Sequence, residues 1–230
     1  MAPPPAAPPP GPRGRTLYVM RHAESAANAA HAAADDVTFR DAQLTAVGCM
    51  QAAAWRLAAS AWGVEQIYVS PLRRALQTAA IAFTHGDARF VVCRTLRETH
   101  WSHQQNRGTA WAGLEPWLQR PEVFGRVEGG PGRLHPNVTK LAGASAVWDP
   151  AGEDVLGTEE VESRGRETIE SARRWVHEEA KGKRDVVAMV THYGVIQALF
   201  GCAVGNAAVL RVVYNLDGSI RSVEEMKPLR

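Results

Sequence analysis

The sequence has 230 residues, of which 45% are hydrophobic and 22% charged, and this composition excludes a collagen, a coiled coil and a largely disordered polymer. Its 26 basic and 24 acidic residues leave a net charge of +2, so neither nucleic acid nor a membrane is the expected partner. The three cysteines, Cys49, Cys93 and Cys202, lie far apart and form no C-x-x-C pair, which argues against disulfides and predicts a cytoplasmic protein.

The N-terminal segment differs sharply in composition from the rest of the chain. Half of the 14 prolines lie in the first twelve residues, and the stretch lacks the apolar run of a secretory signal. It offers nothing to bury in a core, so we predict a disordered, Pro/Ala-rich extension over residues 1–15. Residues 16–230 are predicted to form a single domain.

Short apolar runs then alternate with amphipathic segments. Strands are expected at 16–20, 66–69, 90–93, 186–190 and 208–214, with an edge strand at 219–224. Helices are expected at 44–62, at 72–83, at 161–180 and from 195 onward, the second capped by Ser70 with Pro71 as its first residue. This order predicts an α/β fold with a mainly parallel central sheet and helices on both faces. The alternation stops at 99–159, which we interpret as a variable insertion or lid.

Three of the expected strands end in basic or imidazole side chains. The first is followed by Arg21 and His22, the second by a turn that leads to Arg74, and the fourth by His192. Each could be an ordinary structural residue when taken alone. Ligands of such sheets bind beyond the carboxyl ends of the strands, where helix N-termini also attract anions. The three sites together therefore predict a pocket for a phosphate-sized anion.

Five stretches of the sequence resemble signatures of one family, the histidine phosphatase superfamily, also called the phosphoglycerate mutase-like family. They are YVMRHAESAAN, LTAVGCMQA, VSPLRRALQTA, LRE at 96–98 and VTHYGVIQAL. The blocks occur in the family's order and span residues 17–199. The resemblance implies a phosphoglycerate mutase-like fold.

The resemblance also implies a role for each residue that matches a family motif. His22 corresponds to the nucleophile that becomes a phosphohistidine, and Glu98 to the proton donor for the leaving alcohol. Arg21, Arg74 and His192 correspond to the groups that hold the phosphoryl oxygens. No metal site and no cofactor are implied.

Other positions of the motifs carry weaker expectations or depart from the family pattern. Asn28 and Ser25 match polar positions near the phosphate and are expected to contribute secondary substrate contacts. Arg73 is expected on the rim, because neighbouring helix residues point about 100° apart. Ala23 stands where many members of the family have glycine, and Tyr193 stands where some of them have it. Both residues add a side chain close to the expected phosphate position.

The favoured function is hydrolysis of a small phosphomonoester without a metal, and two alternatives stay open. The segment after Glu98 does not resemble the recognition segment of cofactor-dependent phosphoglycerate mutases, which weakens the mutase alternative. A phosphate-binding regulatory pseudo-enzyme would be expected to have lost a motif residue, whereas all are present. A metal hydrolase would have to use either His31, Asp35 and Asp36 or His100 and His103, and is less favoured. The sequence identifies neither the ester nor the oligomeric state.

Overall fold

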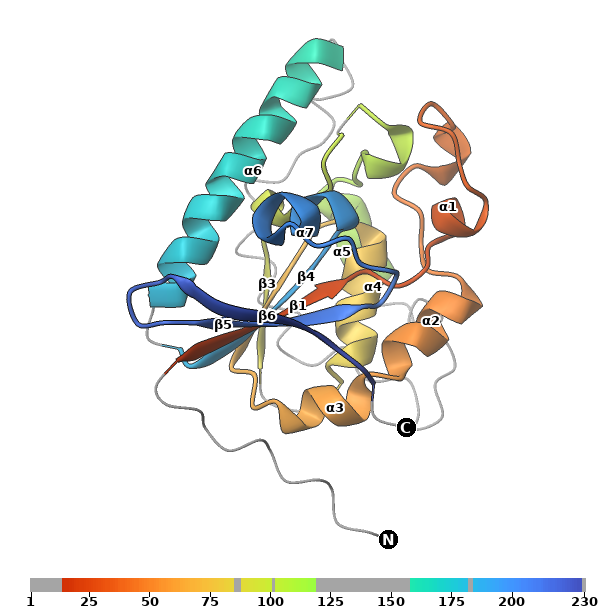
Figure 1. The fold of residues 1–230 in the computed structure, drawn as a ribbon. Helices are drawn as coiled ribbons and strands as arrows, with labels where there is room; N and C mark the ends of the chain where they lie inside the picture. Colours follow the sequence, from red (N-terminus) through yellow and green to blue (C-terminus); the bar gives the residue numbers. More distant parts are fainter. Residues whose placement is uncertain (1–13, 85–87, 101, 119–157, 182–183, 229–230) are drawn as a thin grey trace, which may run out of the picture.

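The computed structural model describes residues 14–84, 88–100, 102–118, 158–181 and 184–228. These residues form a central β-sheet with helices packed on both sides (Figure 1). Most of the predicted extension and most of the predicted lid lie outside the described residues. Within them, no helix combines the length and the apolar character needed to cross a bilayer.

The sheet has six strands in the order β3-β2-β4-β1-β5-β6. Their bounds are Arg15–Arg21 (β1), Gln66–Val69 (β2), Arg89–Val92 (β3), Val186–Thr191 (β4), Val209–Tyr214 (β5) and Ile220–Met226 (β6). Strands β3, β2, β4 and β1 are parallel, whereas β5 and β6 are antiparallel to their neighbours. The predicted α/β class is confirmed, with a mixed sheet, and the edge strand expected at 219–224 is observed as β6 at Ile220–Met226.

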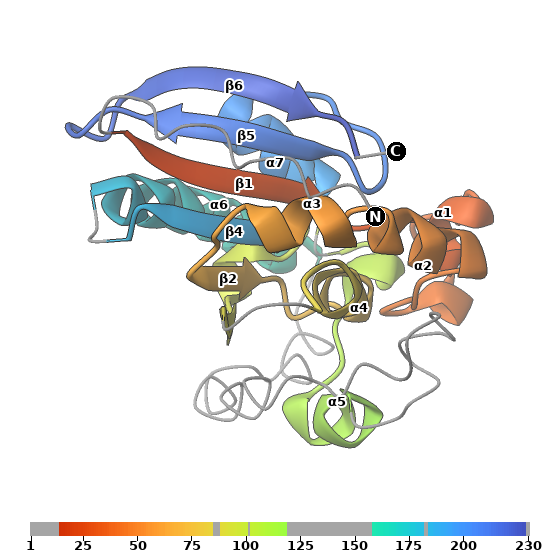
Figure 2. The same cartoon turned by 90° about the horizontal axis from the view of Figure 1, so that it is seen from below.

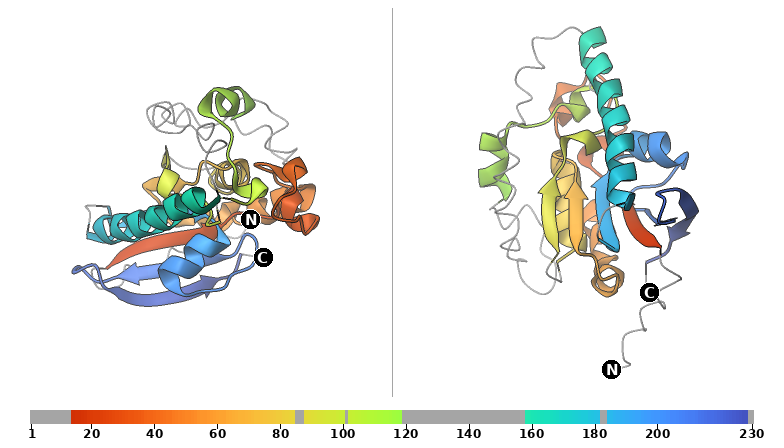
Figure 3. Two further views of the ribbon diagram at one scale, coloured as in Figure 1. Left: turned by 90° about the horizontal axis from the view of Figure 1, so that it is seen from above. Right: turned by 90° about the vertical axis from the view of Figure 1, so that its left-hand side faces the viewer.

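Helices cover both faces of the sheet because successive strand residues point to opposite sides. In β1, Tyr18 and Met20 join one apolar cluster, and Leu17 and Val19 join the other. The first face carries α2 (Ala46–Ala53), α3 (Arg56–Ala61) and α4 (Arg73–Ala82). The opposite face carries α6 (Thr158–Lys181) and α7 (Tyr193–Phe200). Figure 2 shows the first group in front of the strands, and Figure 3 shows α6 and α7 from the other side.

The segment 44–62 was expected to form one continuous helix, and that prediction was wrong, because the segment forms two helices. Helix α2 ends at Ala53 and α3 begins at Arg56. Between them, the Trp55 N–H donates to the carbonyl of Ala52, three residues back instead of four, at 3.2 Å. The turn directs the Trp55 ring into the core, where it contacts Trp62. Burial of this ring stabilises the break, which an alanine-rich segment does not reveal.

The N-terminus of α4 also differs from the expectation. Leu72, not Ser70, is the cap residue, and the helix begins at Arg73. The side chain of buried Asp41 replaces a local cap, since its Oδ1 accepts a hydrogen bond from the Arg73 N–H at 2.8 Å. The Ser70 hydroxyl oxygen still accepts a hydrogen bond from the Leu72 N–H, at 3.3 Å, just before the helix begins.

The remaining elements are short, and the last of them joins the apolar cluster on the first face through Leu114 and Trp117. They are α1 (Ala26–Ala29), η1 (Val37–Phe39), η2 (Arg94–Leu96), η3 (Gln104–Asn106) and α5 (Trp111–Leu118). The last two belong to the predicted insertion, whose residues 119–157 are not described. Helix α6 spans 158–181 and extends beyond the sheet at its N-terminal half (Figure 1). That half therefore stands beside the ends of the parallel strands.

Candidate active site

The carboxyl ends of the four parallel strands meet at a cavity of about 570 Å³. Five of the seven predicted site residues line it, namely Arg21, His22, Asn28, Arg74 and Glu98. His192 lies directly behind this wall, with its ring centroid 5.0 Å from that of His22. Ser25 is buried and does not line the cavity. Sequence motifs more than 160 residues apart are therefore brought together by the sheet order.

His22 follows β1 and is held with one ring nitrogen facing the backbone. Its Nδ1 lies 2.8 Å from the carbonyl oxygen of Ala23, which can only accept, so Nδ1 carries the proton. The other nitrogen, Nε2, accepts a hydrogen bond from Nε of Arg74 at 3.2 Å. Burial holds the pKa of His22 well below its usual value, and the charge of Arg74 lowers it further. The imidazole is therefore neutral at physiological pH, with its lone pair on Nε2.

Two arginines supply positive charge around this nitrogen. Arg74 lies in the first turn of α4, and burial lowers its pKa to about 10, which leaves it protonated at neutral pH. Arg21 ends β1, donates to the Val204 carbonyl at 2.7 Å and lies over the ring of Tyr193, 5.3 Å from its centroid. Arg73, in contrast, does not line the cavity and packs over Trp117. The arrangement favours a bound anion.

Glu98 lies just after η2 and is held by the chain on both sides of the cavity. Its Oε1 accepts hydrogen bonds from the backbone N–H of Thr99 at 2.8 Å and of Gly194 at 3.0 Å. A Cβ at position 194 would lie only 2.6 Å from this oxygen, which explains the need for glycine there. Burial raises the pKa of Glu98, although the charge of Arg74 opposes the shift. This carboxyl group is thereby favoured in its protonated form relative to an exposed glutamate.

His192 ends the β4 segment and caps α7, and it is completely buried. Its Nε2 lies 2.6 Å from the hydroxyl oxygen of Ser70. Its Nδ1 is buried and, within the described residues, has no hydrogen-bond partner. Burial holds the pKa of His192 well below its usual value, with Arg74 acting in the same direction. Ser70 is thus a contact of the second histidine, a role that the sequence did not indicate.

Asn28 lines the cavity, and its side-chain oxygen is occupied by local contacts. Oδ1 accepts hydrogen bonds from the Ser25 N–H at 3.1 Å, from the Ser25 hydroxyl at 2.9 Å and from Nδ2 of Asn206 at 3.2 Å. Its amide nitrogen is therefore the atom that can donate to a ligand. Ser25 acts as the N-cap of α1 and orients Asn28 instead of touching the cavity.

Sequence reasoning missed the residues that hold Arg74, because they lie in the insertion and carry no distinctive pattern. The Gln105 carbonyl and the Asn106 side-chain oxygen each accept from the Arg74 guanidinium at 2.8 Å. Asn106 is fixed in turn, since its Nδ2 donates to the Thr99 carbonyl at 2.9 Å and its own carbonyl accepts from buried Arg97. Arg97 is the middle residue of the 96–98 stretch. This network joins the acidic motif to the second arginine.

We expect Asn106→Ala to lower kcat/KM by about 10- to 100-fold, because Arg74 loses the acceptor that fixes its guanidinium. The rise in KM should dominate if the arginine holds the phosphoryl group of the substrate. Gln104→Ala is a matched control in the same turn, whose side chain does not line the cavity. Kinetics should be measured well below the melting temperature of each variant. An unchanged KM for Asn106→Ala would contradict a positioning role.

The described residues contain no group of three or more His, Cys, Asp or Glu side chains arranged to hold a metal ion. His100 and His103 lie together, with ring centroids 5.2 Å apart, and both line the cavity. His31, Asp35 and Asp36 do not line it. The functional groups that the described residues bring to the cavity are therefore guanidinium, imidazole, amide and hydroxyl groups, with Glu98 as the one carboxyl group among them.

Comparisons with known proteins concern the family and the fold of the chain. The family model of the histidine phosphatase superfamily (branch 1) matches residues 17–211. A phosphoglycerate mutase from Bacillus anthracis has the same fold, with a TM-score of 0.58 and 22% identity over 93% of this chain and 92% of that one. A putative alpha-ribazole-5'-P phosphatase from Escherichia coli aligns with a TM-score of 0.57 and 15% identity, over 91% and 95% of the two chains. No curated protein sequence matches the chain.

Proposed function

The chain belongs to branch 1 of the histidine phosphatase superfamily, and on that premise we propose that it hydrolyses small phosphomonoesters through a phosphohistidine on His22. The observation that carries this proposal is the state of the His22 ring. Nδ1 donates to the Ala23 carbonyl, so the neutral imidazole has its lone pair on Nε2, beside the guanidinium of Arg74. This is the state that a nitrogen nucleophile requires.

The proposed reaction has two displacements at phosphorus. In the first, Nε2 of His22 attacks, the bond from phosphorus to the ester oxygen breaks, and the carboxyl group of Glu98 gives its proton to the leaving alcohol. In the second, water attacks the phosphohistidine while the Glu98 carboxylate accepts a proton. The bond from phosphorus to Nε2 then breaks and phosphate leaves. The raised pKa of Glu98 supports its role as the acid.

In this proposal the side chains of Arg21, Arg74 and His192 donate hydrogen bonds to the negatively charged phosphoryl oxygens. Guanidinium groups suit the task because their paired N–H donors match the geometry of phosphate oxygens. We further propose that the Ser70 hydroxyl donates to Nε2 of His192. The proton of the neutral ring then resides on Nδ1, which becomes a donor for a phosphoryl oxygen. The buried, unpartnered state of Nδ1 within the described residues supports this assignment.

A panel of phosphomonoesters tests the proposed function directly. The protein should release inorganic phosphate from p-nitrophenyl phosphate and from at least one alkyl phosphate, with no bisphosphorylated primer present. The same preparation should be assayed for conversion of 3-phosphoglycerate to 2-phosphoglycerate. Efficient isomerisation with little free phosphate would make the protein a mutase. Failure to turn over any ester would reject both enzymatic proposals.

Chelators should leave the activity unchanged, because the guanidinium groups of Arg21 and Arg74 supply the positive charge that a metal ion supplies in other phosphatases. Phosphate release should be compared before and after dialysis against EDTA, with a zinc-dependent phosphatase as the control for effective chelation. Loss of activity with EDTA, restored by zinc or magnesium, would contradict metal independence.

A further inference from the structure

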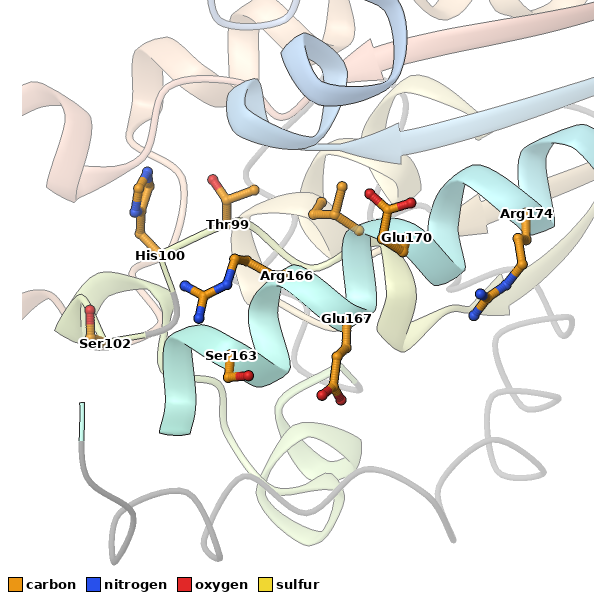
Figure 4. Close-up of a pocket in the computed structure, with 9 residues that line it drawn as sticks. Thr99, His100, Ser102, Ser163, Arg166, Glu167, Glu170 and Arg174 are labelled. Atoms are coloured by element: carbon orange, nitrogen blue, oxygen red, sulfur yellow. The ribbon is translucent and has the colours of Figure 1, made fainter. Parts of the chain in front are cut away.

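A second cavity of about 970 Å³ adjoins the proposed phosphate pocket. The two cavities share Thr99 and His100 in their walls, so they meet at the loop that follows Glu98. The opposite wall of the second cavity is formed by residues 163–174 of α6 (Figure 4). Neither the family motifs nor the proposed chemistry uses this space.

The part of the second cavity next to the phosphate pocket is rich in hydrogen-bond donors. Ser102 and Ser163 contribute hydroxyl groups, and Arg166 contributes a guanidinium group. Figure 4 shows the Arg166 side chain extending from α6 toward the loop that carries His100 and Ser102. Among the described residues, no carboxylate forms an ion pair with Arg166. Its charge is therefore available to a ligand.

The two carboxylates that line the same cavity do not neutralise this end of it. Glu170 forms an ion pair with Arg173, its neighbour on α6. Glu167 and Arg166 leave the helix in different directions, with Glu167 turned away from the loop of His100 (Figure 4). Arg174 lies farther along the helix and donates to the Ser171 hydroxyl. The remaining charge beside Thr99 is thus positive.

The proposed chemistry directs the substrate toward this end. Glu98 protonates the leaving oxygen in the proposed mechanism, so the alcohol portion of the ester must lie on the Glu98 side of the phosphoryl group. Thr99 is the next residue, and it is also part of the wall shared with the second cavity. An alcohol portion that extends past Thr99 enters the space in front of Arg166.

We propose that the second cavity is a subsite for an additional oxyanion, a carboxylate or a second phosphoryl group, on the alcohol portion of the substrate. Arg166 is its main contact, and the hydroxyl of Ser163 is a supporting donor. The inference rests on the proposed function and narrows it to esters that carry a further acidic group. Arg166 is then a specificity-determining residue of the reaction.

Two matched pairs of substrates test the subsite. 3-Phosphoglycerate and glycerol 3-phosphate differ in a carboxylate, and fructose 1,6-bisphosphate and fructose 6-phosphate differ in a second phosphoryl group. The wild-type protein should prefer the more acidic member of at least one pair by about tenfold in kcat/KM. The pair that shows the preference identifies the oxyanion. Absence of a preference in both pairs would overturn the proposal.

The variant Arg166→Gln should abolish that preference and leave turnover of p-nitrophenyl phosphate, which has no second oxyanion, unchanged. Arg89→Gln is the matched control, because exposed Arg89 begins β3 at the opposite end of the sheet. A preference that persists in Arg166→Gln would overturn the proposal. If the protein turns over no ester at all, the proposed function is wrong, but that result does not decide whether the subsite exists. Calorimetric affinities of the same pairs for the wild-type protein and Arg166→Gln then decide the subsite.

Discussion

Replacement of His22 by alanine is expected to lower turnover by about 10⁴-fold or more, because it removes the only nitrogen placed to attack phosphorus in the proposed mechanism. The fold should persist. The backbone contacts of this position, from the His22 N–H to the Thr191 carbonyl and from the Ala207 N–H to the His22 carbonyl, do not involve the imidazole. Circular dichroism and the melting temperature should therefore remain close to those of the wild-type protein.

The measurement is steady-state phosphate release from p-nitrophenyl phosphate, an ester whose leaving group needs little protonation. His177→Ala is a suitable control, since His177 is exposed on α6, far from the cavity lining. Turnover of His22→Ala within a few-fold of the wild-type value would show that His22 is not the nucleophile. A folded His22→Ala protein is required for either conclusion.

Replacement of Glu98 by glutamine is expected to separate substrates by their leaving groups. Glutamine keeps the shape of the side chain and an oxygen that can accept from Thr99 and Gly194, but it has no proton to transfer. Alkyl esters, whose alkoxide is a poor leaving group, should lose about 10²- to 10⁴-fold in kcat. Aryl phosphates such as p-nitrophenyl phosphate should lose far less in the first displacement. Equal losses on all esters would remove Glu98 from the role of acid.

The pH dependence of kcat/KM is a second test of the role of Glu98. Protonated Glu98 is the active form for the first displacement, so kcat/KM of alkyl esters should fall as the pH rises through its pKa. Burial raises that pKa, which places the fall at higher pH than for an ordinary glutamate. His22 does not contribute to this fall in kcat/KM, because its pKa lies well below the usual value and its ring stays neutral as the pH rises. The Glu98→Gln variant should lack this limb of the profile.

Local motifs were sufficient to predict which residues gather at the strand ends. His22, Arg74 and His192 each directly follow a strand or begin the next helix, and strand order then places them side by side. The direction of β5 was not predictable in the same way. An apolar run of alternating residues indicates a buried strand but not whether it runs with or against its neighbour.

Contacts between distant segments were the main source of error. The cap of α4 comes from Asp41, 32 positions before Arg73, so local sequence pointed wrongly to Ser70. Asn106 holds Arg74 from a segment with no helical or strand periodicity, where nothing distinguishes it from its glutamine neighbours. Such residues are found by tracing the hydrogen bonds of a catalytic group outward, which requires coordinates.

Direct detection of the covalent intermediate tests the central claim. The protein should be mixed with a ³²P-labelled phosphomonoester, quenched in alkaline detergent within the first turnover, and digested for mass spectrometry. The expected result is a phosphoryl label that survives alkali, is lost in acid, maps to His22 and is absent from His22→Ala. An active protein that forms no such label, or carries it on another residue, would rule out a phosphohistidine on His22.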